Sequence, residues 1–420
     1  MKKTREKLIL VILLATVILI IILFFIVLSL NMASSDYEYR QLALPDNFSL
    51  PDARVIAIGT ATHGNAEPYD ITIEMLQKMK KERGSVAFVL EELTGDGARI
   101  NQIHSYYDDE QERPLGFYNV YNNSEMDRLL SWIKSEGINL YGIDIQSTYQ
   151  EVEEIKRFLN EKGYSDINID KLRSKTHVEF EKQMNQQIIK EIENIMDELL
   201  KSKTIDEREF DYISHLIDCI QMNYEYSAGG EQYNVRDKMM AENVLWVMEH
   251  ELKYYNNENI ILLTHSGHII EDDFTMNFRD MLYINAENKD ILYVTMGHHL
   301  SNYLGDDYYT IVTEAKNNSF LADSNLPNDK RKLFSIERKG SLIDAIGAES
   351  PSIKFCTSEY LKQAGIATWD LTLIGSYFNN INTFIPARFT INTNVETCFD
   401  AMLYFDQLTP NIDNRSYLDK

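Results

Sequence analysis

Hydrophobic residues recur in two patterns along most of the chain, and each pattern predicts a type of element. Short runs rich in Val, Ile and Leu predict strands buried on both faces, as in a mostly parallel sheet. These runs span residues 54–58, 86–90, 139–143, 259–263 and 290–295. Apolar residues at helical spacing lie between them. The alternation predicts an α/β fold with a mostly parallel central sheet flanked by helices.

Two of the predicted helices carry start and stop signals. Pro68 suits the first turn of a helix that ends at Gly84. Ser124 with Asp127 is typical of the cap of a second helix, which ends at Gly137. Further helices are expected over residues 148–162 and 234–255, and further strands over 390–392 and 401–405.

A longer helical stretch interrupts the strand–helix alternation. Residues 170–227 are almost free of Gly and Pro, and their helical pattern breaks only near Lys203. The stretch predicts a helical subdomain over about residues 165–230, inserted in the α/β domain.

The N-terminal region has a different pattern, a single hydrophobic run over residues 8–30 without any charge. At about 1.5 Å per residue the run would span roughly 34 Å, enough for a bilayer core of about 30 Å. A buried core helix rarely lacks a polar face, and the hydrophobic core of a signal peptide usually has only about 7–15 residues. The run therefore predicts an uncleaved transmembrane anchor. A cleaved signal peptide is the alternative.

The charges around this run predict its orientation. Lys2, Lys3, Arg5 and Lys7 precede it, and cationic flanks stay in the cytoplasm. We therefore expect a single-pass protein of the cell membrane with a cytoplasmic N-terminus and an extracellular main domain. Residues 1–30 would form the basic flank and transmembrane helix, 31–50 a polar stalk, and 51–420 the domain.

Composition narrows the function further. The chain has 420 residues and is 44% hydrophobic, which is enough for a sizeable core. Its 41 Lys and Arg against 65 Asp and Glu give a net charge of −24, which argues against a nucleic-acid partner because phosphate would repel it. Three cysteines exclude a disulfide scaffold and a Cys-rich zinc module.

Polar residues that could bind a ligand or take part in catalysis follow four of the predicted strands. Open α/β sheets bind ligands at these carboxyl ends of their strands. His63 lies in a loop of small residues, IGTATHG, and is either a general base or a loop histidine without a role. Glu91 would orient a histidine, hold a metal or form a surface salt bridge. Its neighbour Glu92 is expected to point the other way, into solvent. Asp144 would accept a hydrogen bond from a histidine or cap the next helix.

Two further histidines follow the strand at 259–263. His265 and His268, at i and i+3 beside a glycine, would converge on one point, bind a metal or serve as structural residues. His298 and His299 either contribute to the same rim or, as we expect, lie in a solvated loop. The sequence has no GxSxG elbow, Walker loop or GxGxxG, so hydrolysis would use activated water rather than a serine.

The ordered set of motifs resembles the erythromycin esterase family over about residues 51–410. The matching segments are IGTATHGNAE, FVLEE, LYGIDIQS, RDKMMAENVLWVME, LLTHSGHI, MGHHLSNYLGDDYY and FDAMLYFDQLTP. The resemblance implies an α/β fold with a helical subdomain, a large cleft between them, and hydrolysis of a macrolide lactone ester without a metal or other cofactor.

The resemblance also implies roles for individual residues. His63 matches the general base that deprotonates water, and Glu91 matches the active-site glutamate. His265 and His268 match paired histidines that polarise the ester carbonyl or assist the leaving group. Arg236 matches an arginine near the cleft that would stabilise an oxyanion. Another matched position, Asp144, would have a supporting role.

One position departs from the family pattern. The first family motif is typically GEATHG, and Thr60 stands where that motif has a glutamate. A threonine can form a hydrogen bond, but it offers no carboxylate to tune the pKa of His63.

Three functional hypotheses arise from these observations. The first is a membrane-anchored extracytoplasmic hydrolase of a small-molecule ester or macrolide-like substrate. The second is a catalytically weakened surface protein that keeps the family cleft to bind a ligand. The third is a metal-dependent hydrolase with a divalent ion on His63, Glu91 and one histidine of the later pair.

Overall fold

The computed structural model describes most of the predicted domain. The described residues are 43–46, 48–97, 119–173, 182–228, 232–277, 290–323, 331–338, 353–378 and 389–412, with Thr16, Ile346 and Asn382. Apart from Thr16, the predicted anchor at 8–30 lies outside them, as does most of the predicted stalk. Within the described ranges, no helix combines the length and apolar character that a membrane span requires.

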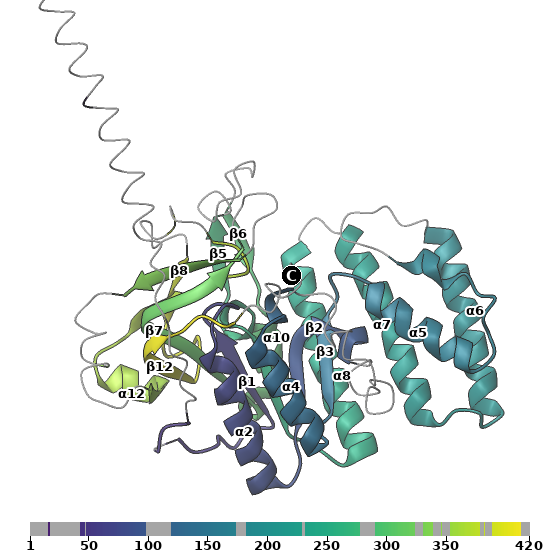
Figure 1. Ribbon diagram of the computed structural model, residues 1–420, viewed down its shortest axis with the longest axis horizontal. Coiled ribbons are helices and arrows are strands. Elements are labelled where there is room, and N and C mark those ends of the chain that lie inside the picture. The colour runs from purple at the N-terminus through teal and green to yellow at the C-terminus, as the bar shows by residue number, and fades with distance from the viewer. Residues whose placement is uncertain are drawn as a thin grey trace, which may run out of the picture.

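The centre of the fold is an eight-stranded, mostly parallel sheet with the order β3-β2-β4-β1-β7-β12-β9, and β8 pairs with β7 (Figure 1). The pairings β12–β9 and β7–β8 are antiparallel. The strands are β1 Val55–Thr60, β2 Ala87–Leu93, β3 Leu140–Asp144, β4 Ile260–His265, β7 Tyr308–Ala322, β8 Lys332–Glu337, β9 Ile353–Thr357 and β12 Ala401–Leu408. The predicted α/β class with a mostly parallel sheet is confirmed.

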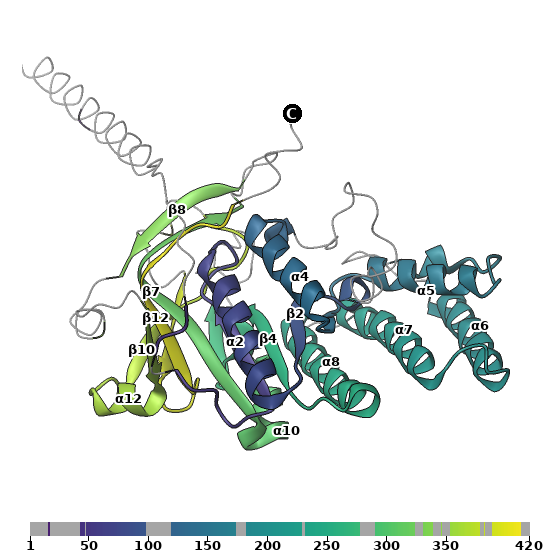
Figure 2. The same cartoon turned by 60° about the horizontal axis from the view of Figure 1, so that its bottom comes forward.

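Helices cover both faces of this sheet. Helices α2 (Glu67–Arg83) and α4 (Ser124–Glu136) pack on one face, and α8 (Gln232–Tyr255) and α10 (Met296–Leu304) pack on the other (Figure 2). Side chains in β1 alternate between these two cores, since Ile56 and Ile58 face α2 whereas Val55 and Ala57 face α8. Strands covered on both faces must be apolar throughout, which explains their continuous hydrophobic runs.

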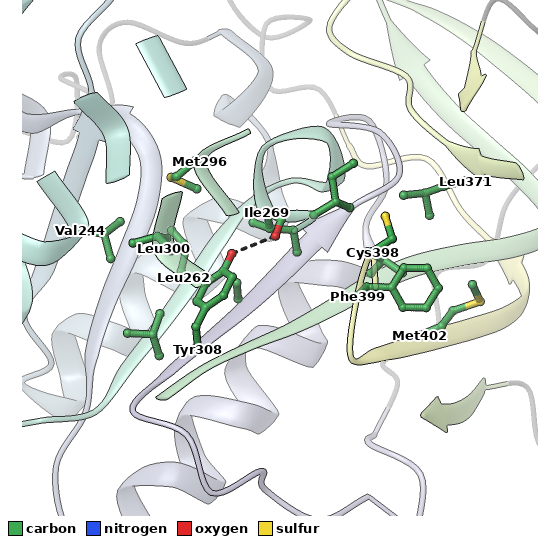
Figure 3. Close-up of a cluster of buried hydrophobic side chains, with 14 of the residues drawn as sticks. Val244, Leu262, Ile269, Met296, Leu300, Tyr308, Leu371, Cys398, Phe399 and Met402 are labelled. Atoms are coloured by element: carbon green, nitrogen blue, oxygen red, sulfur yellow. Dashed lines mark hydrogen bonds between the residues drawn. The ribbon is translucent and has the colours of Figure 1, made fainter. Parts of the chain in front are cut away.

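The core under α8 and α10 also includes residues from the C-terminal strands. Val244 and Leu300 lie on the same side as Leu262, while Phe399 and Met402 continue the cluster toward β12 (Figure 3). Within it the Tyr308 hydroxyl donates a hydrogen bond of 2.9 Å to the carbonyl of Ile269. This bond ties β7 to the short helix α9 (Ser266–Ile269) that follows β4.

A group of helices extends beyond the β3 edge of the sheet (Figure 1). Helices α5 (Tyr149–Glu161), α6 (Lys182–Lys201) and α7 (Glu207–Ala228) pack around their own apolar cluster, which includes Ile155, Ile192 and Leu216. Helices α6 and α7 lie in the region of about 165–230 where the sequence predicts a helical subdomain, whereas α5 corresponds to the helix expected over 148–162. The remaining elements are η2 Asn119–Tyr121, η3 Ile169–Leu172, β5 Phe274–Asn277, β6 Asp290–Tyr293, η4 Gly305–Asp307, α12 Ser358–Gln363, β10 Thr368–Thr372 and β11 Thr390–Asn394.

Two local predictions need correction. The strand predicted at 290–295 forms as β6 but lies outside the central sheet, in an antiparallel ribbon with β5. The cap of α4 is Asn123 rather than Ser124, because the Asn123 side chain accepts the backbone N–H of Met126 at 2.8 Å. Gly84, with φ of 88°, ends α2 as predicted.

Candidate functional site

The candidate residues meet at the carboxyl ends of four neighbouring strands. Thr60 and His265 are register partners at the ends of β1 and β4, Glu91 lies near the end of β2, and Asp144 ends β3. Gly142 permits the close approach of β3 to β2, since a Cβ there would lie 2.0 Å from the carbonyl oxygen of Leu93. Parallel pairing therefore brings together residues that are far apart in the sequence.

Glu91 organises the centre of the site. It is buried, and its Oε2 accepts the Thr264 hydroxyl at 2.5 Å and the backbone N–H of His265 at 3.0 Å. Burial would raise the pKa of this carboxyl, but the adjacent His268, His63 and Arg236 outweigh it and hold the pKa well below the usual value. Glu91 is therefore an ionised acceptor rather than a proton carrier near neutral pH.

Arg236 connects Glu91 to Asp144 from helix α8. Its Nε donates to Asp144 Oδ1 at 3.0 Å, and its Nη2 contacts Asp144 Oδ2 at 2.5 Å and Glu91 Oε1 at 2.9 Å. All three side chains are buried. A forked guanidinium matches this carboxylate geometry, so Arg236 fixes α8 against the ends of β2 and β3.

His268 lies between two buried carboxylates. Its Nδ1 is 2.9 Å from Asp237 Oδ1 and its Nε2 is 3.3 Å from Glu91 Oε1. Burial lowers the pKa of this imidazole, but Asp237 and Glu91 raise it to about 10 overall. The Tyr293 hydroxyl donates to the same Asp237 oxygen at 2.8 Å. His268 is therefore an imidazolium at neutral pH.

His63 is the only half-buried member of the predicted catalytic set, and its ring faces two others. The centroid of its ring is 5.2 Å from that of His265 and 6.1 Å from that of Tyr121. Burial lowers the pKa of His63 to about 4, partly offset by the charge of Glu91 and reinforced by His268. His63 is therefore neutral near pH 7 and able to accept a proton.

His265 has one nitrogen fixed by the backbone. Its Nδ1 accepts the N–H of Gly267 at 3.3 Å, which assigns the proton of the neutral ring to Nε2. Burial lowers the pKa of this imidazole to about 3, and the neighbouring His63 and His268 lower it further. The Ala61 carbonyl faces the ring, yet the buried Nε2 completes no hydrogen bond with any described residue.

Thr60 is buried beside this histidine, at the end of the neighbouring strand. Its hydroxyl has no hydrogen-bond partner within the described part of the chain. Two polar groups on adjacent strand ends, the Thr60 hydroxyl and His265 Nε2, are thus buried without a partner among the residues that the structure describes. Such groups are costly unless a ligand or water satisfies them.

Two sequence-based expectations about neighbouring residues were wrong. Glu92 is fully buried rather than solvated, because β2 is an inner strand with helices on both faces, and it accepts the N–H of Leu93 at 3.0 Å. His298 and His299 lie in helix α10 and are half-buried, not in a solvated loop.

Three residues that contact the site were missed by the sequence reasoning. They are Asp237 and Tyr293, which hold His268, and Thr264, which holds Glu91. The signal for Asp237 was its position next to Arg236 in a helix with an apolar face, where a charged residue needs a partner. Tyr293 carried no comparable signal.

The donor set shows little sign of a metal site. Glu91 already accepts from Arg236, Thr264 and the His265 backbone, and a guanidinium would compete with a cation for its oxygens. Over the ranges that the structure describes, no group of three or more His, Cys, Asp or Glu side chains is arranged to hold a metal ion.

A model of the erythromycin esterase family matches residues 81–408, which is most of the chain. The chain belongs to the erythromycin esterase family. The match includes Glu91, Asp144, Arg236, His265 and His268, whereas Thr60 and His63 precede it. A search of curated proteins found no match.

Solved structures of similar fold are known. A Bacillus cereus protein is 18% identical with a TM-score of 0.64, and the alignment covers 86% of this chain and 90% of that one. A succinoglycan biosynthesis protein is 14% identical with a TM-score of 0.62 over 86% and 90% of the two chains. A mutant of erythromycin esterase EreC in its open conformation is 15% identical with a TM-score of 0.56 over 86% and 92%. At these identities the likeness shows the fold.

Proposed function

We propose that this member of the erythromycin esterase family hydrolyses a small-molecule ester or lactone with water activated by His63. The main supporting observation is a neutral, half-buried His63 beside a neutral His265 whose Nε2–H has no partner among the described residues. Hydrolysis by water needs a base that deprotonates the water and a hydrogen-bond donor that stabilises the oxyanion, and these two adjacent rings could supply both.

The reaction would proceed by addition and elimination. His63 takes a proton from water while the water oxygen forms a bond to the ester carbonyl carbon, and the carbonyl electron pair moves onto its oxygen. The Nε2–H of His265 donates to that oxyanion. The C–O bond of the leaving group then breaks, and protonated His63 returns its proton to the departing alkoxide. The products are a carboxylic acid and an alcohol.

The buried charges would support this reaction without contacting the substrate. Arg236 and His268 carry two positive charges, which Glu91, Asp144 and Asp237 more than balance. Their hydrogen bonds fix the orientation of the His265 strand end rather than contact the substrate. We assign Glu91, Asp144, Arg236 and His268 to positioning and electrostatic support, with no cofactor.

The proposal includes the location of the enzyme. The uncharged run over 8–30 and its cationic flank support a single-pass anchor with the domain outside the cell. The substrate would then be met at the cell surface, as expected of an enzyme that inactivates a macrolide before it enters.

The test is turnover of a panel of esters and macrolide lactones by His63→Ala. We expect loss of at least about 100-fold in kcat/KM, the usual contribution of a general base, with an unchanged unfolding temperature. His299→Ala is the matched control, because that half-buried histidine lies in α10 outside the network. Turnover retained by His63→Ala would refute the role of His63.

One observation favours a second candidate, a ligand-binding protein with weakened catalysis. Without the family glutamate at Thr60, burial leaves His63 with a pKa near 4, which makes it a weak base. This candidate predicts saturable ligand binding but no turnover of the ester panel by the wild-type chain. Robust hydrolysis by the wild type excludes it.

A metal-dependent reaction at the same site makes a separate prediction. Protein purified without chelators would contain about one equivalent of a divalent metal by elemental analysis, and would lose activity when that metal is removed. Full activity in metal-free protein would rule this variant out.

A further inference from the structure

A cavity lies at the opposite end of the sheet from the histidine site. It has a volume of about 360 Å³ and is bounded by the start of β3, the ends of α5 and α8, and the start of α7. His250, in its wall, follows Arg236 by 14 residues on α8, so the two are about 21 Å apart along that helix. The cavity is therefore separate from the proposed catalytic centre.

Aromatic rings line much of this cavity. His250 is central, with its ring centroid 5.7 Å from that of Tyr212 and 6.1 Å from those of Tyr141 and Tyr255. Phe158 contributes a fifth ring from α5. Behind His250 the indole of Trp246 stacks on its ring at 4.6 Å. The rings of Tyr141, Tyr212 and Tyr255 are inclined to the His250 ring by 73°, 65° and 51°. Such rings offer both faces and edges, and aromatic ligands pair with them edge-to-face or offset-stacked.

Two polar atoms in the lining have no partner among the described residues. They are Nδ1 of His250 and the hydroxyl of Tyr212, both buried. His250 is only 4% exposed. Other polar groups in the wall are satisfied, since Asn139 and Tyr141 both donate to Glu251. The His250 nitrogen and the Tyr212 hydroxyl would therefore be satisfied by a hydrogen-bonding group of a ligand.

The charged side chains at the rim of this cavity have no net charge. Arg157 and Arg208 are matched by Glu161 and Glu209, and Arg157 bonds Glu161 at 2.7 Å. Burial lowers the pKa of His250 to about 4, so this imidazole adds no charge at neutral pH. A balanced rim and a neutral wall favour an uncharged ligand.

We propose that this cavity is a second binding site, for a neutral planar aromatic molecule that carries one hydroxyl or ring N–H. A cavity of about 150 Å³ holds one benzene ring, so this volume accommodates a two-ring molecule. The hydroxyl or N–H would meet His250 Nδ1 and the Tyr212 hydroxyl while the rings pack against the aromatic wall.

The experiment is calorimetric titration of the full-length chain in detergent with 2-naphthol, naphthalene and 2-naphthalenesulfonate. We expect 2-naphthol to bind one site at least 10-fold more tightly than either other compound. Equal affinity for naphthalene would overturn the assigned hydrogen bond. Tighter binding of the sulfonate would overturn the preference for a neutral ligand, and absence of saturable 2-naphthol binding up to 1 mM would overturn the site.

Variants locate the binding. His250→Phe keeps an aromatic wall without the ring nitrogen and should weaken 2-naphthol binding about 10-fold, and Ile213→Trp should fill the cavity and abolish it. His215→Phe is the matched control, because His215 is also a buried helix histidine that stacks on Trp246 but does not line the cavity. Each variant is first checked for a wild-type unfolding temperature. Unchanged affinity in both lining variants would overturn the proposal.

His63→Ala separates this proposal from the proposed hydrolase function. It should abolish turnover and leave 2-naphthol affinity unchanged. Loss of 2-naphthol binding in His63→Ala would place the ligand in the histidine site and overturn the second site.

Discussion

At the residue scale, the protonation states of three histidines distinguish their roles. The half-buried His63 and the buried His265 stay neutral, whereas His268 lies between Asp237 and Glu91 and stays charged. In the proposed mechanism the same type of side chain therefore supplies a base, a neutral donor and a fixed cation. The difference comes from the nearest partner, because burial lowers the pKa of all three imidazoles.

Thr60→Glu tests how strongly a carboxylate at the end of β1 would tune His63. We expect it to raise the pKa of His63 above about 4, because a nearby negative charge favours the imidazolium. The acid limb of the kcat/KM profile should then move to higher pH and the plateau should rise. Thr60→Gln, which is isosteric with Glu but uncharged, is the control. An acid limb that moves equally in both variants would contradict the electrostatic explanation.

Asp237→Asn tests the origin of the charge on His268. The folded-state pKa of about 10 lies above the unfolded value of about 6.5, so this group stabilises the fold below pH 6.5 and loses that contribution as pH rises through 10. Between pH 6.5 and pH 10 the free energy of unfolding should therefore lose on the order of a few kcal/mol from this group in the wild type, and less in the variant. Urea unfolding at pH 6.5 and pH 10 measures the difference.

Asp273→Asn is the control for that experiment. Asp273 lies 3.1 Å from Nδ1 of His298, but both side chains are partly exposed, so solvent screens the pair. This control should keep the wild-type pH dependence. An Asp237→Asn chain with wild-type pH dependence would show that Asp237 does not hold the proton on His268.

At the element scale, strand ends and helix starts position the site. Helix α8 carries Arg236 and Asp237 as neighbours, which fix it to β3 and to α9 respectively. Helix α4 packs against α2, which follows the His63 loop. Asn123, just before α4, adds a polar contact between the two helices, because its side chain also donates to the Tyr69 hydroxyl of α2 at 3.1 Å.

Asn123→Ala should therefore destabilise the domain more than Ser124→Ala. The Asn123 side chain caps α4 and contacts α2, so its loss should cost about 1–2 kcal/mol. Ser124 is not the cap, and its substitution should change the free energy of unfolding by less than about 0.5 kcal/mol. Urea unfolding of both variants decides the matter, and a larger effect from Ser124→Ala would contradict the assigned cap.

At the scale of the whole molecule, the charge divides unequally along the chain. Residues 1–7 carry four cations against one glutamate, so the acidic excess lies entirely in residues 8–420. This division suits the proposed orientation, in which an acidic domain lies outside the cell and the cationic flank stays inside.

The proposed anchor predicts membrane association that survives alkaline extraction. The full-length chain should remain in the membrane pellet in carbonate at pH 11, and external protease should digest the domain on intact cells. A chain that begins at residue 43 should be released into the soluble fraction. A full-length chain found in the soluble fraction, or one whose mass shows loss of the hydrophobic run, would contradict an uncleaved anchor.

The fold class and most elements could be predicted from the sequence alone. Continuous apolar runs of this length are typical of strands covered on both faces, so β1, β2, β3 and β4 were predicted within two or three residues of their bounds. The same logic predicted that residues at their carboxyl ends would meet, which holds for Glu91, Asp144 and His265.

The charges and contacts of those residues emerged only from the three-dimensional packing. Asp237 and Tyr293 come from different elements, and nothing local in the sequence indicates that they hold His268. Burial of Glu92 and the place of β6 outside the main sheet likewise depend on which strands become neighbours. Hydrophobic period is a local property of the chain, whereas pairing partners and pKa values depend on long-range packing.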